Sequence, residues 1–294
     1  MRRWPGVAVS GILIAALLTG CGGPAGTDSD LTDDWGGLPP AQQFVPQTGV
    51  CHPLADRVGY LTSYAPMDCG KTHKAETLYV GQFPAEHANR PTPPAVDSAA
   101  LRAVFPDCDA RAQEFVGADW RGARLTVQVV PPSPAGWAGG SRWYRCDIFV
   151  LSAIDTAREY PADHNGSLRG ALRQPSPLSY GCLDADRWGS LWPRACDQTH
   201  HFEYVGTWTA PLTSLAVLDD DPGRAHRSCR SVIARYVGVP DDGMMRYRTG
   251  TAYRTPSEEA WARGDRGVRC FLYFGDRVLT RSLKGGGAAA LPIR

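Results

Sequence analysis

The chain has 294 residues and is close to neutral, with 31 lysines and arginines against 30 aspartates and glutamates. No run of lysine and arginine stands out. The sequence therefore has no electrostatic footprint for a nucleic-acid partner, nor for anionic lipid headgroups. Nucleic acid is excluded as an expected partner.

Residues 1–20 have the features of a signal peptide. Two arginines precede an apolar run, Val7 to Leu18, which is too short to span a bilayer but has the length of a signal-peptide core. The run ends in LTGC at Cys21, which resembles the lipobox of bacterial lipoprotein signals. That resemblance implies cleavage before Cys21, lipidation of its sulfur (palmitate-type chains) and anchoring on the extracytoplasmic face of the cell membrane. The alternative is an ordinary secretory signal with a chance cysteine.

The segments at the two ends of the mature chain differ from the rest in composition. Residues 21–48 are small, polar and rich in proline and glycine, so they are expected to form a flexible tether. Residues 285–294 begin with GGGAAA and are expected to fray.

The remaining chain contains one pattern twice, in residues 49–155 and 179–284. The intervening residues 156–178, rich in proline, glycine and serine, are expected to be a linker. The fixed offsets between matched positions predict two tandem homologous domains of about 100 residues each. Each copy contains four cysteines, in the order Cys51, Cys69, Cys108, Cys146 and Cys182, Cys196, Cys229, Cys270.

Each copy is predicted to run strand, loop, strand, helix, strand, loop, strand. Apolar spacing of three and four indicates a helix over 98–116, interrupted at Pro106, and its counterpart over 228–237. Runs rich in β-branched and aromatic residues indicate strands at 77–83, 125–130, 144–151, 202–208 and 268–274. The predicted fold class is α+β, with one main helix on a small antiparallel sheet in each copy.

The eight later cysteines are expected to form disulfides, because an even set at repeated positions is typical of secreted domains. Four cysteines allow three pairings in each copy. Sequential pairing is favoured, since the first two bracket the opening strand and the last two would join the helix to the last strand. Each bridge would add about 2–4 kcal/mol of stability.

A Cys-x3-His-x2-Glu motif occurs in both copies, with His73 and Glu76 in the first and His200 and Glu203 in the second. A metal site is one interpretation. A disulfide-bonded cysteine cannot be a thiolate ligand, however, and residues three apart on a strand point to opposite faces. Too few ligands would remain for structural zinc. We expect the motif to be structural, with no metal and no cofactor.

The ordered motifs of each half continue into Pro-Ser-x3-Trp-x2-Gly-x-Arg-x2-Arg-Cys, which contains Trp137 and Arg142 or Trp261 and Arg266. The whole pattern resembles the septum-formation domain of actinobacterial envelope proteins. The resemblance implies a part in cell division. Only the second half has Asp265 before its arginine. Both tryptophans are expected to be core anchors; the alternative is a ligand-stacking role.

Common catalytic signatures are absent from the sequence, including Gly-x-Ser-x-Gly and His-Glu-x-x-His, and no cysteine is left over as a nucleophile. We therefore expect a non-enzymatic lipoprotein with a binding or scaffolding role. Its expected partners are envelope or division proteins or cell-wall polymer. The alternative is an envelope hydrolase or metal-binding protein that uses the two His/Glu pairs.

Overall fold

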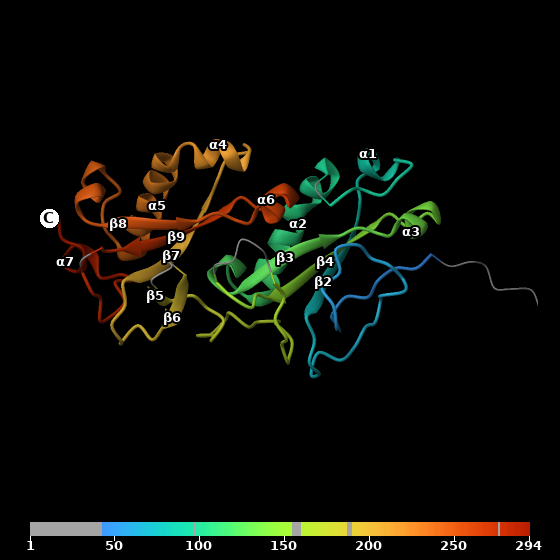
Figure 1. Cartoon of the computed structure of the whole chain (residues 1–294), viewed down its shortest axis with the longest axis horizontal. Coiled ribbons are helices and arrows are strands. Elements are labelled where there is room, and N and C mark those ends of the chain that lie inside the picture. The colour runs from blue at the N-terminus through green and yellow to red at the C-terminus, as the bar shows by residue number, and fades with distance from the viewer. Residues whose placement is uncertain (1–42, 97, 155–159, 187–189, 276) are drawn as a thin grey trace, which may run out of the picture. The chain divides into compact units, whose positions relative to one another are not determined.

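The computed structural model describes residues 43–294, except 97, 155–159, 187–189 and 276 (Figure 1). Residues Phe44–Arg294 form one compact unit. The expected signal peptide, Cys21 and most of the expected tether lie outside the described residues. Among the described helices, none combines the length and the apolar character that a membrane span requires.

The first half contains a four-stranded antiparallel sheet. Its strands are β1 (Val50–His52), β2 (Ala75–Gln82), β3 (Leu125–Val130) and β4 (Trp143–Val150), in the order β1-β2-β4-β3. Helix α2 (Ala99–Val116) packs on β2 and β3. Its buried residues include the apolar positions spaced at three and four that predicted it.

The second half contains a five-stranded antiparallel sheet in the order β6-β5-β7-β9-β8. Without β6, this order matches that of the first sheet strand for strand. A single bridge between Cys51 and Met67 takes the place of β6 beside β1. The strands are β5 (Cys182–Ala185), β6 (Leu191–Arg194), β7 (Phe202–Thr209), β8 (Gly250–Arg254) and β9 (Gly267–Tyr273), and α5 (Pro222–Val237) packs on β7, β8 and β9.

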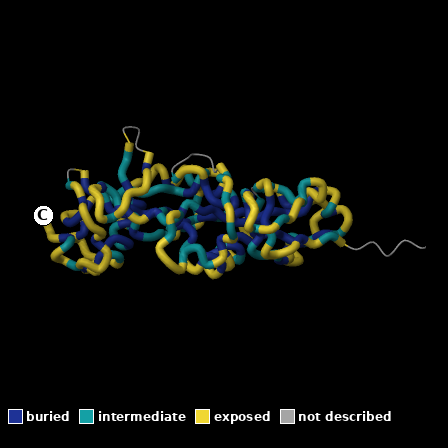
Figure 2. Tube along the Cα trace, turned by 90° about the horizontal axis from the view of Figure 1, so that it is seen from below, coloured by how far each residue is buried: buried dark blue, intermediate teal, exposed yellow. Residues whose placement is uncertain are grey.

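Short helices lie between these elements and, in the case of α7, after the last strand. They are α1 (Ala85–Ala88), η2 (Trp120–Gly122), α3 (Pro134–Ala138), α4 (Leu215–Asp219), η3 (Gly243–Tyr247), α6 (Glu258–Arg263) and α7 (Gly287–Ala290). The described buried residues lie in the interior of the trace, and the exposed ones lie on its outside (Figure 2).

Both main helices end at a glycine in the left-handed region, Gly117 with φ 89° and Gly238 with φ 83°. Glycine adopts this conformation without the steric cost that a Cβ atom would add. The expected interruption of α2 at Pro106 was wrong, because the helix runs through it. Proline removes one helical hydrogen bond, and burial of the neighbouring Phe105 and Cys108 in the core holds the helix continuous.

The eight cysteines form four disulfides in chain order, which is the pairing that the sequence favoured. The second bridge of each half joins the main helix to the last strand. The pairs are Cys51–Cys69, Cys108–Cys146, Cys182–Cys196 and Cys229–Cys270.

Two segments that were expected to be loose pack against the cores. In the expected linker, Leu168 is 2% exposed and belongs to the core of the first half. The backbone N–H groups of Gly170 and Leu172 donate to carbonyls at the end of α2. In the expected tail, Leu291 is fully buried in the core of the second half.

The two halves meet through η2, which contacts β7 and β9. The Arg121 guanidinium lies 2.7 Å from Asp265 and 2.7 Å from Asp109, and the Arg121 and Asp265 side chains are almost fully buried. The Arg269 side chain donates to the carbonyl of Arg121. Asp265, where the first half has Ser141, therefore bridges the two halves.

Candidate functional site

The Glu76 carboxylate of β2 is buried and hydrogen-bonded to the segment that was expected to be a linker. Ser167 Oγ donates to Oε1 at 2.6 Å, and the backbone N–H of Leu168 donates to Oε2 at 2.7 Å. Ser167 Oγ in turn accepts from the backbone N–H of Arg169 at 3.1 Å. Glu76 thus fastens a later segment of the chain to the second strand.

Glu203 of β7 makes the same arrangement in the second half. Ser282 Oγ donates to Oε1, and the backbone N–H of Leu283 donates to Oε2 at 2.9 Å. A further donor is the Tyr236 hydroxyl of α5, 2.6 Å from Oε1. Burial and the hydrogen bond to Glu203 raise the pKa of Tyr236 above its usual value, so the hydroxyl keeps its proton and donates.

Each motif histidine closes a turn in its own backbone. His73 Nδ1 lies 2.8 Å from the Lys71 carbonyl, and His200 Nδ1 lies 2.8 Å from the Gln198 carbonyl. Because a carbonyl only accepts, Nδ1 is the protonated nitrogen of each ring. Both rings are buried, and Nε2 of each has no hydrogen-bond partner among the described residues.

The structure brings His73 and His200 into no metal-ligand cluster. Among the described residues, the one set of three possible ligand atoms within 4.8 Å of one another comes from Cys51, Cys69 and Glu76. Both cysteines of that set are in a disulfide, so neither sulfur is a thiolate.

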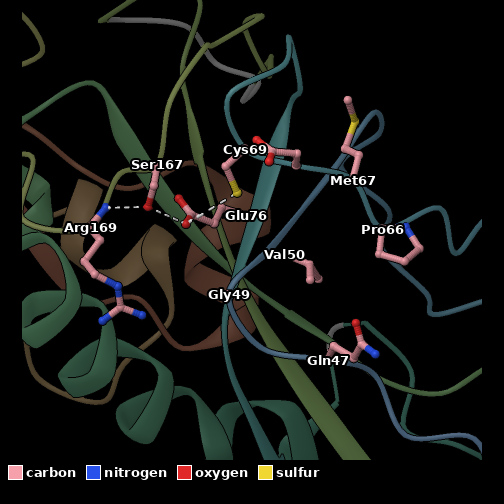
Figure 3. Close-up of a pocket in the computed structure, with 10 residues that line it drawn as sticks. Gln47, Gly49, Val50, Pro66, Met67, Cys69, Glu76, Ser167 and Arg169 are labelled. Carbon is pink, nitrogen blue, oxygen red and sulfur yellow. Dashed lines mark hydrogen bonds between the residues drawn. The ribbon is translucent and has the colours of Figure 1, made fainter.

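An open pocket of about 630 Å³ lies beside this corner of the first half (Figure 3). Asp68 and Arg169 contribute opposite charges to its wall, whereas Val50, Pro66 and Met67 contribute apolar surface. In Figure 3 the Arg169 guanidinium and the Met67 side chain lie on opposite sides of the pocket. This chemistry suits a short peptide or another small ligand that combines charged and apolar groups.

The matched tryptophans, Trp137 and Trp261, are buried. The Arg142 guanidinium lies 4.2 Å from the centroid of the first ring, and that of Arg266 lies 4.3 Å from the second. Each indole N–H donates to a backbone carbonyl. Because an arginine occupies the ring face in both halves, these tryptophans act as packing anchors and do not offer that face to a ligand.

A buried polar network in the first half was not predicted. His52 Nε2 lies 2.9 Å from Thr77 Oγ1, which donates to Asp147, and Asp147 pairs with Arg145 at 2.7 Å. Burial and the charge of Arg145 lower the pKa of His52 to about 4, and burial raises the pKa of Asp147.

The positions in the second half that match His52, Thr77 and Asp147 hold apolar and aromatic side chains that pack together. They are Leu183, Tyr204 and Phe271. A residue-by-residue comparison of the two strand sets would have revealed this difference in the sequence.

The Glu-binding segments are themselves a repeated motif that the sequence reasoning missed. Residues 167–170 read SLRG and residues 282–285 read SLKG, at the same place in both halves. The signal lies beyond the last cysteine of each half, Cys146 or Cys270.

Comparison with known proteins identifies a family. No curated protein and no solved structure matches the chain. A family model described as septum formation matches residues 48–270, which is more than half of the chain and runs from the first strand of the first sheet into β9 of the second. The chain therefore belongs to the septum-formation family.

Proposed function

We propose that the protein is a lipid-anchored, non-enzymatic protein of the extracytoplasmic membrane face that binds envelope or division proteins, or wall polymer, during septum formation. The family membership supports a link to cell division. The observation that carries the non-enzymatic assignment is the burial of the repeated polar side chains. His73, Glu76, His200 and Glu203 are each at most 2% exposed and hydrogen-bonded within the fold.

We also propose that the two halves are tandem copies of one domain. The shared strand order supports this, as do the matched disulfides and the paired Glu–Ser–Leu contacts. The register shift between β2 and β4 falls at the same place as the shift between β7 and β9. Two copies would give one anchored chain two related surfaces, so the copies can diverge in what they bind.

The lipid anchor is tested by feeding cells a labelled fatty acid. Label should enter the wild-type protein and not the Cys21→Ser variant. Equal labelling of both proteins would end the lipoprotein proposal.

The septal role is tested by crosslinking in dividing cells followed by mass spectrometry. Capture of division proteins or wall polymer by the wild type, with loss when the protein is released from the membrane, is the expected result.

The alternative function is an envelope hydrolase or metal-binding protein that uses the two His/Glu pairs. A hydrolase needs its acid–base groups within hydrogen-bond reach of the substrate, and the burial of both pairs opposes that role. Turnover of purified wall substrate by the wild type, with loss in Glu76→Gln or Glu203→Gln, would favour the alternative.

A further inference from the structure

The loop of residues 53–66, here called the Tyr60 loop, carries exposed apolar side chains at Tyr60 and Leu61, which are called its tip below. Tyr60 is 49% exposed and Leu61 is 63% exposed. Four of the twelve large apolar side chains that are exposed among the described residues fall within residues 45–61, the others being Val45 and Leu54. Exposed apolar groups gathered in this way mark a contact surface more often than scattered ones do.

The base of the Tyr60 loop is fixed to the first sheet. Gly59 donates to the Pro131 carbonyl at 2.8 Å, and the Gln128 side chain donates to the Asp56 carbonyl at 2.6 Å. Ser63 Oγ donates to the Asp56 carboxylate at 2.9 Å. These hydrogen bonds fix the backbone on both sides of the exposed Tyr60 and Leu61.

The described chain begins beside this loop. Trp143 Nε1 donates to the Phe44 carbonyl, and the Phe44 ring packs edge-on against Tyr64 of the loop at 4.8 Å. The same Trp143 ring lies against Gly59, where an added Cβ would come within 2.4 Å of it. Phe44, which precedes the exposed Val45, and Gly59, which precedes the exposed Tyr60, therefore both contact the indole ring of Trp143.

The preceding chain is short. Residues 22–43, twenty-two in number, separate Cys21 from Phe44, and a chain of that length spans at most about 75 Å when fully extended. Attachment of Cys21 to a bilayer would hold the Tyr60 loop at an effective concentration on the order of millimolar at the lipid surface.

We propose that the tip of the Tyr60 loop docks on the membrane surface to which Cys21 is attached. This inference rests on the proposed lipid anchor. Leucine would enter the apolar boundary, and tyrosine suits the interface because its ring is apolar and its hydroxyl is polar. The only carboxylate of the loop, on Asp56, already accepts a hydrogen bond from Ser63.

The corresponding segment of the second half is shorter, since Cys182 and Cys196 are 14 residues apart and Cys51 and Cys69 are 18 apart. Among the described residues of that segment, Trp192 on β6 is exposed, and the Arg194 guanidinium lies over one face of its ring, 4.3 Å from the centroid. Docking through the first half alone would leave the second half free for a partner.

The test uses the mature chain from Cys21, coupled through the Cys21 thiol to a maleimide lipid in phosphatidylcholine–phosphatidylglycerol vesicles. The other eight cysteines are in disulfides and do not react. Hydrogen–deuterium exchange is compared with that of the same chain blocked with N-ethylmaleimide in solution. Exchange in residues 53–66 should slow several-fold on the vesicles, with no change in residues 211–219.

Leu61→Ser should abolish the slowing, and it should leave the fold intact because this side chain is mostly exposed. The matched control is Leu212→Ser, which alters a side chain that is 93% exposed in the second half and should keep the slowing. Equal exchange in residues 53–66 on vesicles and in solution would overturn the proposal, as would equal slowing in residues 211–219. Because the coupling bypasses lipidation in cells, this result is independent of the fatty-acid labelling test.

Discussion

His52 is a buried ring in the first half, and the second half has Leu183 at the matching strand position. A histidine whose pKa falls from 6.5 to about 4 on folding binds fewer protons in the folded state than in the unfolded state between those values. Its stabilising contribution is therefore fully present above pH 6.5. As the pH falls from 6.5 to 4, this contribution to the free energy of unfolding decreases by at most about 3 kcal/mol.

We predict that His52→Leu makes stability less dependent on pH between 6.5 and 4. The measurement is the free energy of unfolding from urea titrations across that range. The raised pKa of Asp147 acts in the opposite direction, since it lowers stability as that carboxyl ionises at higher pH. Parallel pH profiles for the wild type and the variant would contradict the assignment.

The contact between Glu203 and residues 282–283 gives a second prediction at this scale. Glu203→Ala leaves the hydroxyl of Ser282 and the N–H of Leu283 without their acceptor, which should cost about 1–3 kcal/mol. The melting temperature should fall by several degrees. The control Glu114→Ala removes a side chain that is 77% exposed, and it should change the melting temperature by less than about a degree.

At the level of elements, the segment after β4 behaves as part of the first half. We predict that Leu168→Ala lowers the free energy of unfolding by about 2–5 kcal/mol, because it leaves a cavity in the core. Leu212→Ala is the matched control, since that side chain is 93% exposed. A neutral Leu168→Ala would restore the interpretation of residues 156–178 as a linker.

The strongly periodic elements could be predicted from the sequence. The predicted strands at 125–130 and 202–208 agree with Leu125–Val130 and Phe202–Thr209 to within a residue, and the helix predicted over 98–116 is Ala99–Val116. These segments bury apolar residues in a regular order, which is the signal that periodicity detects.

Other elements depend on distant partners and gave no such signal. The strand β8 has no buried residue in its pattern, pairs with β9 at the edge of the described sheet and packs under α5. The first turns of α5 read as a polar run, and their start is marked by the Asp221 cap and Pro222. At the candidate site, the motif residues were found by repetition, but the serine–leucine partners of Glu76 lie about ninety residues away in sequence.

At the scale of the whole molecule, the junction between the halves depends on a buried charge. Burial opposes ionisation of Arg121, but Asp265 and Asp109 more than offset it, so the pKa of Arg121 lies above its usual value. Asp265 of the second half thus stabilises the charge of Arg121 in the first half. Its counterpart, Ser141, is also buried but carries no charge.

We predict that Asp265→Asn lowers the free energy of unfolding by about 1–3 kcal/mol, because the buried Arg121 guanidinium loses one of its two closest carboxylate partners and keeps Asp109. Glu259→Gln is the control, as its ion pair with Arg57 is about half exposed on both sides and should contribute less than about 1 kcal/mol. Equal effects of the two substitutions in chemical denaturation would show that the junction does not depend on Asp265.

The binding of Glu76 to Ser167 and Leu168 also sets an order of events during synthesis. The Glu76 and Glu203 carboxylates accept hydrogen bonds from serine and leucine residues that follow the last strand of each half. A chain that emerges with its N-terminus first must hold Glu76 unpaired until about ninety further residues have appeared. The Cys51–Cys69 bridge needs only eighteen. Oxidation can therefore precede closure of the first half, and a chaperone or oxidase would meet the first sheet while this corner is still open.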